Sequence, residues 1–386
     1  MLLIKNGKII TMNGKNYENG CILIEDGKII EVGENIKIHG KCEVIDAKRG
    51  WVTPGFIEAH CHIGLIEEGM GFEGNDINEV TDPITPHLRA IDGINPFDTA
   101  FHEALKGGVT TVMTGPGSAN VIGGQFAIIK TCGICVDKMV VKAPSAMKIA
   151  FGENPKRVYN SKGKMPITRM ATAALLRETL VKAKNYKNKK DEAASKGESF
   201  DIDLKMEALI PVIQKEIPLK AHAHRADDIL TAIRIAKEFD VMMTLDHCTE
   251  GDLVAEYIKE SEFPAIVGPT LTFKSKIEVK NKNFTTPGIL NGKGIKVAIT
   301  TDHPVVPIEY LSMCAGLAAK AGWTEEEALK AITINAAEII GIDDRIGSID
   351  NGKDADIAIF DGNPLESLTK TLYTIIDGKI VYKYEV

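Results

Sequence analysis

The tripeptide His60-Cys61-His62 carries the clearest chemical signal in the sequence, because it places two imidazoles at the end of the apolar run 55–59. Successive side chains of a β-strand point to opposite faces, so His60 and His62 would share one face while Cys61 points away. Two imidazoles held on a rigid strand form half of a metal site. Alone the pair is weak evidence, since many buried histidines only satisfy a hydrogen bond. Further candidate ligands lie at the ends of other short apolar runs, namely His222, His224, His247 and Asp302.

This set of side chains predicts a divalent metal centre with one or two ions. Imidazole is a good ligand for Zn, Fe, Ni or Co, and a carboxylate adds charge and a base; zinc is the favoured ion. The set exceeds what one closed tetrahedral site needs, so two ions sharing a water would be possible. Such a pair needs a second bridging anion, for which the candidates are Lys148, after carboxylation by CO2, and Glu153. The alternative for Lys148 is an ion pair with a carboxylate at the end of its strand, because an unpaired buried ammonium is costly.

Size and composition narrow the classes of protein and of partner. The chain has 386 residues, an apolar fraction of 44% and a formal net charge of -7. These values fit a globular protein with one large and one small domain, and they give no reason to expect nucleic acid or an anionic membrane as partner. The amino terminus does not resemble a signal peptide, and no apolar run is long enough to span a bilayer. We therefore expect a cytoplasmic protein. Seven scattered cysteines fit a reducing compartment, and the pair Cys132 and Cys135 is interpreted as two ordinary buried thiols.

The two ends of the chain carry the same β-hairpin signal. Asn-Gly or Asp-Gly joins β-rich runs at residues 4–10, 24–30 and 375–381. These dipeptides favour tight hairpin turns because both residues tolerate positive φ. We expect residues 1–52 and 345–386 to form one composite β-sandwich domain.

The middle, residues 53–344, alternates strand-like and helix-like segments, which implies a parallel sheet. About eight strands in this length favour a (β/α)8 TIM-like barrel, in which chemistry collects at the carboxyl ends of the strands. Three amphipathic helices stand out: one capped by Asn95 and ending at Gly107, one after Asp228, and one from Thr324 to Gly341. Gly-rich residues 115–125 are predicted to form an active-site loop, and His39 and His102 are given no role. The expected strands end at residues 62, 114, 151, 224, 247, 268 and 302.

Three segments together resemble the amidohydrolase superfamily. Residues 54–62, PGFIEAHCH, are similar to its PGxIDxHxH motif, with Glu58 where the family usually has Asp. Residues 347–364 resemble the segment that returns to the β-domain, and residues 301–304 resemble the last barrel strand. The resemblance spans nearly the whole chain and is closest to the imidazolonepropionase and prolidase-like branch. It implies a metal-dependent hydrolase with a (β/α)8 barrel.

The resemblance also implies roles for individual residues. His224 shares a strand face with His222, so it could contact substrate or exchange roles with that residue. Lys148 matches the lysine that prolidase-like members carboxylate, although Glu153 could bridge instead. Imidazolonepropionases carry an acidic residue where this chain has Arg225, which either binds a substrate carboxylate or forms a salt bridge with Asp227 or Asp228. The implied metal ligands are His60, His62, Lys148, His222, His247 and Asp302.

The function expected from this resemblance is hydrolysis of a C–N bond in a small molecule. A metal-activated hydroxide would attack an amide or cyclic amide carbon, with Asp302 as general acid and base. The alternatives are deamination of a heterocyclic amine, a prolidase-like dipeptidase, and a barrel that binds a metal or ligand without turnover. We also expect a homo-oligomer, as for many relatives.

Overall fold

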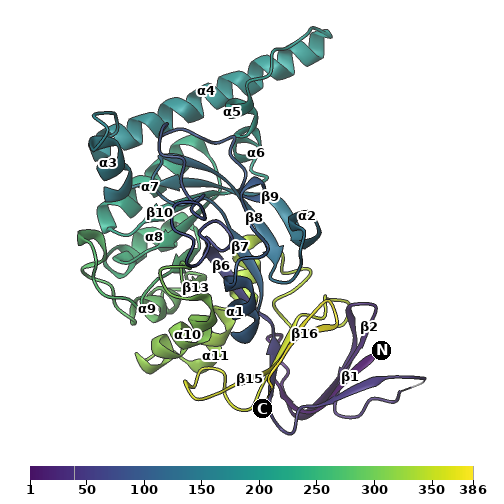
Figure 1. The fold of residues 1–386 in the computed structure, drawn as a ribbon. Coiled ribbons are helices and arrows are strands. Elements are labelled where there is room, and N and C mark those ends of the chain that lie inside the picture. The colour runs from purple at the N-terminus through teal and green to yellow at the C-terminus, as the bar shows by residue number, and fades with distance from the viewer. Residues whose placement is uncertain (39, 386) are drawn as a thin grey trace.

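The computed structural model describes residues 1–38 and 40–385, so His39 lies outside the described part of the chain. It contains two eight-stranded sheets and a set of helices around the second sheet (Figure 1). Both chain termini lie at the first sheet, at the lower right of Figure 1, and the central two thirds of the chain build the second. The expected α/β class, with a barrel and a sheet built from both ends, is confirmed.

The barrel sheet runs in the order β13-β12-β11-β10-β9-β8-β7-β6 and is nearly closed. Most of its strands are short and buried on both faces, as parallel strands covered by helices should be, whereas the first half of β9 is partly exposed. All of them except β8 end within a few residues of the predicted positions. The strands are β6 (Phe56–Cys61), β7 (Val109–Thr114), β8 (Ile122–Lys130), β9 (Val140–Ala150), β10 (Leu219–Ala223), β11 (Met243–His247), β12 (Ala265–Val267) and β13 (Val297–Ile299).

One strand of the barrel runs against the others. β8 pairs antiparallel with both β7 and β9, whereas every other neighbouring pair is parallel. The prediction of a uniformly parallel sheet was therefore wrong at this strand, and part of the predicted active-site loop, Gly123 to Gln125, belongs to β8. The glycines there had concealed the strand, because glycine disfavours a strand assignment although it can lie in one where other backbone comes close. A Cβ on Gly124 would lie 2.6 Å from the Leu88 carbonyl oxygen.

Hydrogen bonds connect the first strand of the barrel to the segment that follows its last strand. Glu58 on β6 accepts hydrogen bonds from the backbone N–H and the hydroxyl of Thr301, just past β13, at 2.8 and 2.6 Å. The Thr300 hydroxyl donates to the His60 carbonyl at 2.5 Å, and the His62 N–H donates to the His303 carbonyl at 2.9 Å. Glu58 is completely buried, and burial raises its pKa to about 7 although the hydrogen bonds oppose this.

The second sheet joins the two ends of the chain, in the order β16-β15-β14-β5-β1-β2-β3 with β4 paired to β1. Strand β5 extends across residue 52, where the sequence analysis placed a domain boundary. The division of the chain at 1–52 and 345–386 stays a prediction. The strands are β1 (Leu2–Ile9), β2 (Tyr17–Glu25), β3 (Lys28–Gly33), β4 (Glu43–Asp46), β5 (Trp51–Pro54), β14 (Ile357–Phe360), β15 (Thr371–Ile376) and β16 (Lys379–Lys383).

The helices follow the predicted amphipathic segments with two changes. The helix expected from Asn95 begins at Ala100, because the Asn95 side chain caps a turn at Phe97 and leaves that ring 73% exposed. The helix expected from Thr324 to Gly341 is two helices. The helices are α1 (Ala100–Lys106), α2 (Val136–Met139), α3 (Glu153–Asn160), α4 (Arg169–Lys196), α5 (Leu204–Glu207), α6 (Ile210–Ile213), α7 (Ala226–Phe239), α8 (Ala255–Ser261), α9 (Thr286–Gly292), α10 (Leu311–Lys320), α11 (Glu325–Lys330) and α12 (Ile334–Ile340).

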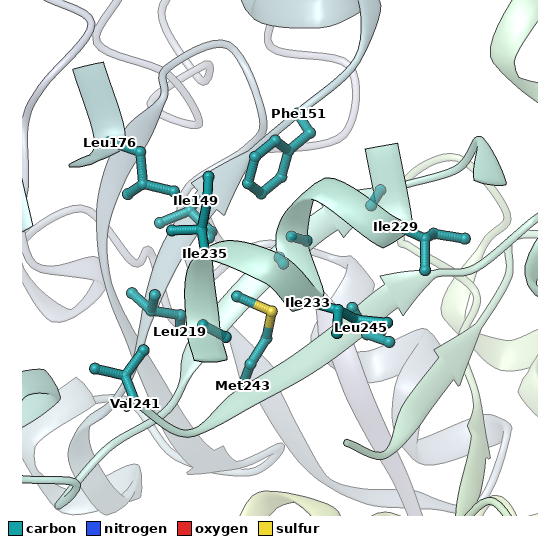
Figure 2. Close-up of a cluster of buried hydrophobic side chains, with 14 of the residues drawn as sticks. Ile149, Phe151, Leu176, Leu219, Ile229, Ile233, Ile235, Val241, Met243 and Leu245 are labelled. Atoms are coloured by element: carbon teal, nitrogen blue, oxygen red, sulfur yellow. The ribbon is translucent and has the colours of Figure 1, made fainter. Parts of the chain in front are cut away.

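A large apolar cluster fixes α4 and α7 against the barrel strands. Figure 2 shows Ile229, Ile233 and Ile235 of α7 beside Leu219 of β10 and Leu245 of β11. All five side chains are at most 6% exposed. Burying such a side chain contributes roughly 1.5–3 kcal/mol, so this packing holds β10 and β11, and the residues at their ends, in a fixed register.

The predicted cap of the helix at Thr324 is present and can be tested. The Thr324 hydroxyl accepts a hydrogen bond from the backbone N–H of Glu327, at the start of α11. Thr324→Ala should lower the free energy of unfolding by about 1 kcal/mol, because a helix donor loses its partner. Chemical denaturation would measure this loss, with Thr285→Ala as control, because Thr285 precedes α9 without a side-chain cap hydrogen bond.

The structure also bears on two further expectations from the sequence. Cys132 and Cys135 are exposed rather than buried, because they lie in the turn after β8 and not in an apolar strand. Among the described residues, no helix has both the length and the apolarity needed to cross a bilayer.

Candidate metal centre

The candidate ligands lie at or just beyond the carboxyl ends of the barrel strands. Two of them, His247 and Asp302, have left-handed backbone, with φ of 75° and 53°. Non-glycine residues rarely adopt such φ values, and where they do the site is often functional. At the end of β11 this conformation breaks the alternation of the strand, so that neighbouring side chains can both face the barrel interior.

The structure brings six predicted residues into two groups of three. His60, His62 and Asp302 form one group, and His222, His224 and His247 form the other. Within each group the potential ligand atoms lie within 4.8 Å of one another. His60 and His247 link the groups, because their ring centroids are 5.1 Å apart. The sequence prediction that these side chains converge is therefore met by the geometry, while their roles stay predictions.

Asp302 is the centre of the first group. Its Oδ1 lies 3.2 Å from His62 Nε2 and 3.5 Å from His60 Nε2. Although burial alone would raise its pKa, the contacts with His247, His60 and His62 hold the pKa of Asp302 well below its usual value. Asp302 Oδ1 is buried and has no hydrogen-bond partner among the described residues. A buried carboxylate oxygen of this kind normally binds a donor or a cation.

Lys148, near the end of β9, is completely buried beside this group. Its Nζ lies 3.3 Å from His60 Nε2. Burial lowers the pKa of Lys148 to about 8, and the nearby carboxylates of Asp246 and Asp302 oppose that shift. This shift increases the share of neutral amine near physiological pH, and the neutral amine is the form that reacts with CO2.

The second group is a compact stack of imidazoles. The ring centroids of His224 and His247 are 4.5 Å apart and nearly parallel, and His222 lies 4.5 Å from His247. Burial lowers the pKa of all three histidines well below the ordinary value. Neutral imidazoles are the form that binds a metal.

Two residues that the sequence analysis missed support His60. Asp246 Oδ2 lies 2.9 Å from His60 Nδ1, in a bent approach, and Asp246 Oδ1 lies 3.3 Å from Lys220 Nζ. The Lys220 ammonium also donates to the Ala59 carbonyl at 2.9 Å, and both charged side chains are fully buried. The signal was the sequence Leu245-Asp246-His247, but strict strand alternation turned Asp246 away from the site.

A third missed residue, Glu278, lies at the second group. Its Oε1 is 3.2 Å from His222 Nε2 and 3.7 Å from His224 Nε2, and the side chain is 1% exposed. Glu278 lies in a single 3-10 turn between β12 and α9, where no periodic pattern marks a buried position. The sequence offered no signal for it.

Two other candidates lie at the edge of the site. The Arg225 guanidinium donates two hydrogen bonds to Asp227 at 2.9 and 3.0 Å, which is the salt bridge weighed against a substrate-binding role. Glu153 opens α3, and its backbone N–H donates to Glu278 Oε2 at 3.1 Å. In the described part of the chain, neither Arg225 nor Glu153 contacts the first group of candidate ligands.

The residues present fit a divalent metal. They combine neutral imidazoles, a carboxylate with an unpaired buried oxygen, and a lysine whose charge is disfavoured. Imidazole and carboxylate are the donors that zinc and its neighbours in the first transition row prefer. Hydrogen bonds to backbone carbonyls orient two of the imidazole rings. His62 Nδ1 donates to the Gly115 carbonyl at 2.7 Å, and His247 Nδ1 donates to the Gly268 carbonyl at 2.8 Å.

Comparison with known proteins agrees with this fold. The chain is 44% identical to a solved amidohydrolase from Thermotoga maritima MSB8, with a TM-score of 0.97 over 100% of both chains. It is 27% identical to an imidazolonepropionase of Caldanaerobacter subterraneus subsp. tengcongensis, over 91% of this chain and 86% of that protein. It is 28% identical to amidohydrolase tasK of Hapsidospora irregularis over 93% of this chain, but it spans only 39% of that protein.

Solved structures with lower identity share the fold alone. One is a prolidase bound to N-methylphosphonate-L-proline, which is 17% identical with a TM-score of 0.62. At the level of the family, the profile described as "Amidohydrolase family" matches residues 51–381, most of the chain. The chain therefore belongs to the amidohydrolase family and is a hydrolase that acts on carbon–nitrogen bonds.

Proposed function

We propose that this protein is a metal-dependent hydrolase that cleaves an amide or cyclic amide bond of a small substrate. The observation that carries the proposal is the position of Asp302. Its unpaired, buried Oδ1 faces His60 and His62 at the mouth of the barrel, beside a second group of three histidines. Barrel enzymes carry their chemistry at this end of the strands.

When bound, a divalent metal would lower the pKa of a water ligand and polarise the substrate carbonyl. Asp302 supplies the proton transfers: an oxygen of its carboxylate accepts the proton of the attacking water and later gives it to the departing nitrogen. The neutral imidazoles of the second group, His222, His224 and His247, provide ligands without adding positive charge. Burial excludes bulk water, which strengthens each electrostatic interaction in the site.

Metal removal tests the dependence directly. Dialysis against a strong chelator should abolish amide hydrolysis, and addition of Zn2+ should restore it, with Mn2+ and Co2+ as comparisons. Metal content would be measured by mass spectrometry on protein purified without chelator. Full activity in protein that contains no metal would disprove the proposal.

Lys148 is proposed as the bridging ligand of a two-metal centre. Its neutral amine would add to CO2, forming an N–C bond and releasing one proton, so that an uncharged amine becomes an anionic carbamate. The support is its burial and the distance of 3.3 Å from Nζ to His60 Nε2. Lys148→Met should reduce the metal content from two equivalents to one, and wild-type protein should bind its second equivalent more fully when bicarbonate is present. Two retained equivalents in Lys148→Met would instead favour Glu153 or another bridge.

The reaction class is tested with substrate libraries of hydantoin-like rings, lactams and dipeptides. Hydrolysis of a cyclic amide leaves the nitrogen in the product, whereas deamination of a heterocyclic amine releases ammonia. An ammonia assay run beside product analysis therefore separates the two reactions. The metal found by mass spectrometry in protein purified without chelator would identify the ion, with zinc as our first choice.

A further inference from the structure

Three of the chain's eight arginines line one pocket on the outer side of the barrel. Arg169 and Arg177 belong to α4, and Arg234 belongs to α7, the helix that packs beside α4 (Figure 1). The pocket has a volume of about 310 Å³, and Asp228 is the one carboxylate among the described residues that line it. A volume of this size suits a small ligand. The lining therefore carries an excess of positive charge, although the whole chain has a net charge of -7.

Carboxylates already hold two of the arginines in a fixed orientation. Arg169 Nε and Nη2 donate to Asp228 at 2.9 and 3.0 Å, and Arg177 Nε and Nη2 donate to Glu238 at 2.6 and 2.8 Å. Each pair uses one edge of the guanidinium. Because a guanidinium has five N–H donors, the Nη1 edge of both groups stays available, and no described residue accepts a hydrogen bond from it.

Arg234 brings a charge that no carboxylate balances. In residues 1–38 and 40–385 its exposed side chain has neither an ion pair nor a hydrogen bond. The hydrogen bonds of Arg177 and the charge of Arg234 hold the pKa of Glu238 below its usual value, so both guanidinium groups lie near that carboxylate. Two carboxylates, Asp228 and Glu238, thus face three guanidinium groups. An anion in the pocket would reduce the remaining repulsion.

We propose that this pocket binds a phosphate group, either as inorganic phosphate or as part of a small phosphomonoester. The planar guanidinium presents pairs of N–H groups that match two phosphate oxygens, whereas a lysine offers a point charge. The chain has 46 basic residues but only eight arginines, so three of them at one pocket favour recognition of an oxyanion. A phosphate with three free oxygens and almost two negative charges suits three guanidinium groups better than a carboxylate does.

The pocket is separate from the candidate metal centre but shares a wall with it. Gly152 lines the pocket, and a Cβ at that position would lie 3.3 Å from Asp228 Oδ2 and 2.6 Å from Glu278 Oε2. Asp228 pairs with Arg169 at the pocket, while Glu278 contacts His222 in the second group of histidines. A ligand in the pocket would therefore lie beside the metal centre without occupying it. The proposal does not depend on the metal-dependent function proposed above.

Isothermal titration calorimetry on the full chain tests the ligand class. The ligands are inorganic phosphate and glycerol 3-phosphate, with malonate as a dicarboxylate for comparison. Because phosphate also binds metal ions, each titration is repeated on protein dialysed against a chelator. We expect one phosphate or phosphomonoester per chain, with the same affinity before and after dialysis.

The ligands also distinguish the two sources of phosphate. Binding of glycerol 3-phosphate alone would assign the pocket to an organic phosphomonoester, and equal binding of both ligands would assign it to the phosphate group itself. Binding of neither, tighter binding of malonate, or binding that disappears with the metal would overturn the proposal.

Variants test whether the arginines of this pocket bind the ligand. Arg234→Met should weaken phosphate binding about 10-fold or more, because a charge-assisted hydrogen bond is lost while no ion pair of the protein is broken. Arg177→Lys keeps the charge but not the planar fork, so it should weaken binding less. The matched control is Arg157→Met, which removes an exposed arginine of α3 that does not line the pocket. Wild-type affinity in Arg234→Met, or an equal loss in Arg157→Met, would overturn the proposal, once thermal unfolding has shown that each variant is folded.

The position of the ligand can be determined in crystals soaked with tungstate, a heavy analogue of phosphate. Anomalous scattering should place the anion between Arg169, Arg177 and Arg234. Tungstate found only at the candidate metal centre, or only elsewhere on the surface, would contradict the assignment.

Discussion

Asp302→Asn should lower kcat by about 10³-fold or more while the protein stays folded and retains most of its metal. General acid–base catalysis contributes about 10²–10⁴-fold, and the asparagine amide cannot take the proton of the attacking water or return it to the leaving nitrogen. The amide oxygen can still serve as a ligand near His60 and His62. Steady-state kinetics on the best amide substrate, together with metal analysis, would measure both quantities.

Asp227→Asn is the control for this experiment. Asp227 is half exposed and pairs with Arg225, so its loss should change kcat little. A variant Asp302→Asn with activity within tenfold of wild type would defeat the proposed proton transfer. Loss of all metal in that variant would show instead that Asp302 acts mainly as a ligand, and the catalytic assignment would have to move to another group.

The second large effect is expected for Asp246→Asn. The carboxylate is fully buried between Lys220 and His60, at 3.3 and 2.9 Å. Its removal leaves the Lys220 ammonium buried without a counter-charge, which costs about 3–5 kcal/mol of folding free energy. It also removes the carboxylate that orients His60, so metal affinity should fall roughly 10- to 100-fold. Chemical denaturation and metal titration would measure the two losses.

Asp356→Asn separates stability from metal binding. Asp356 is a similarly buried carboxylate, 2.6 Å from the Lys130 ammonium, in contact with a lysine but not with a site histidine. Both variants should therefore destabilise the fold, while only Asp246→Asn should weaken the metal. Equal metal affinity in the two variants would show that Asp246 has no role in orienting His60.

The sequence allowed the barrel and most of the proposed ligands to be predicted, because both depend on local patterns. Short apolar runs that end in histidine or aspartate mark the ends of buried strands, and the terminal Asn-Gly and Asp-Gly turns mark hairpins. The cap at Thr324 followed from residue type in the same way. Each of these features is encoded within about ten residues.

What could not be predicted depends on contacts between distant segments or on unusual backbone. Asp246 is in register with His222 on the neighbouring strand and shares its face of the sheet, and the left-handed φ at His247 breaks the alternation, so that His247 can turn to the same side. Glu278 reaches His222 from an irregular turn 56 residues later in the chain. The direction of β8 follows from pairing with two neighbours, and its glycines suggested a loop.

The hydrogen bonds that close the barrel join the same two segments that carry His62 and Asp302. The first and last strands of the barrel sheet meet where Glu58 and His60 on β6 bond to Thr301 and Thr300 beyond β13. His62 and Asp302 lie on opposite sides of that same joint. An ion bound by both His62 and Asp302 would cross-link the barrel, because it would connect segments that lie 240 residues apart in the sequence. Metal binding should then slow amide hydrogen exchange along β6 and β13, an effect that can be measured without a substrate.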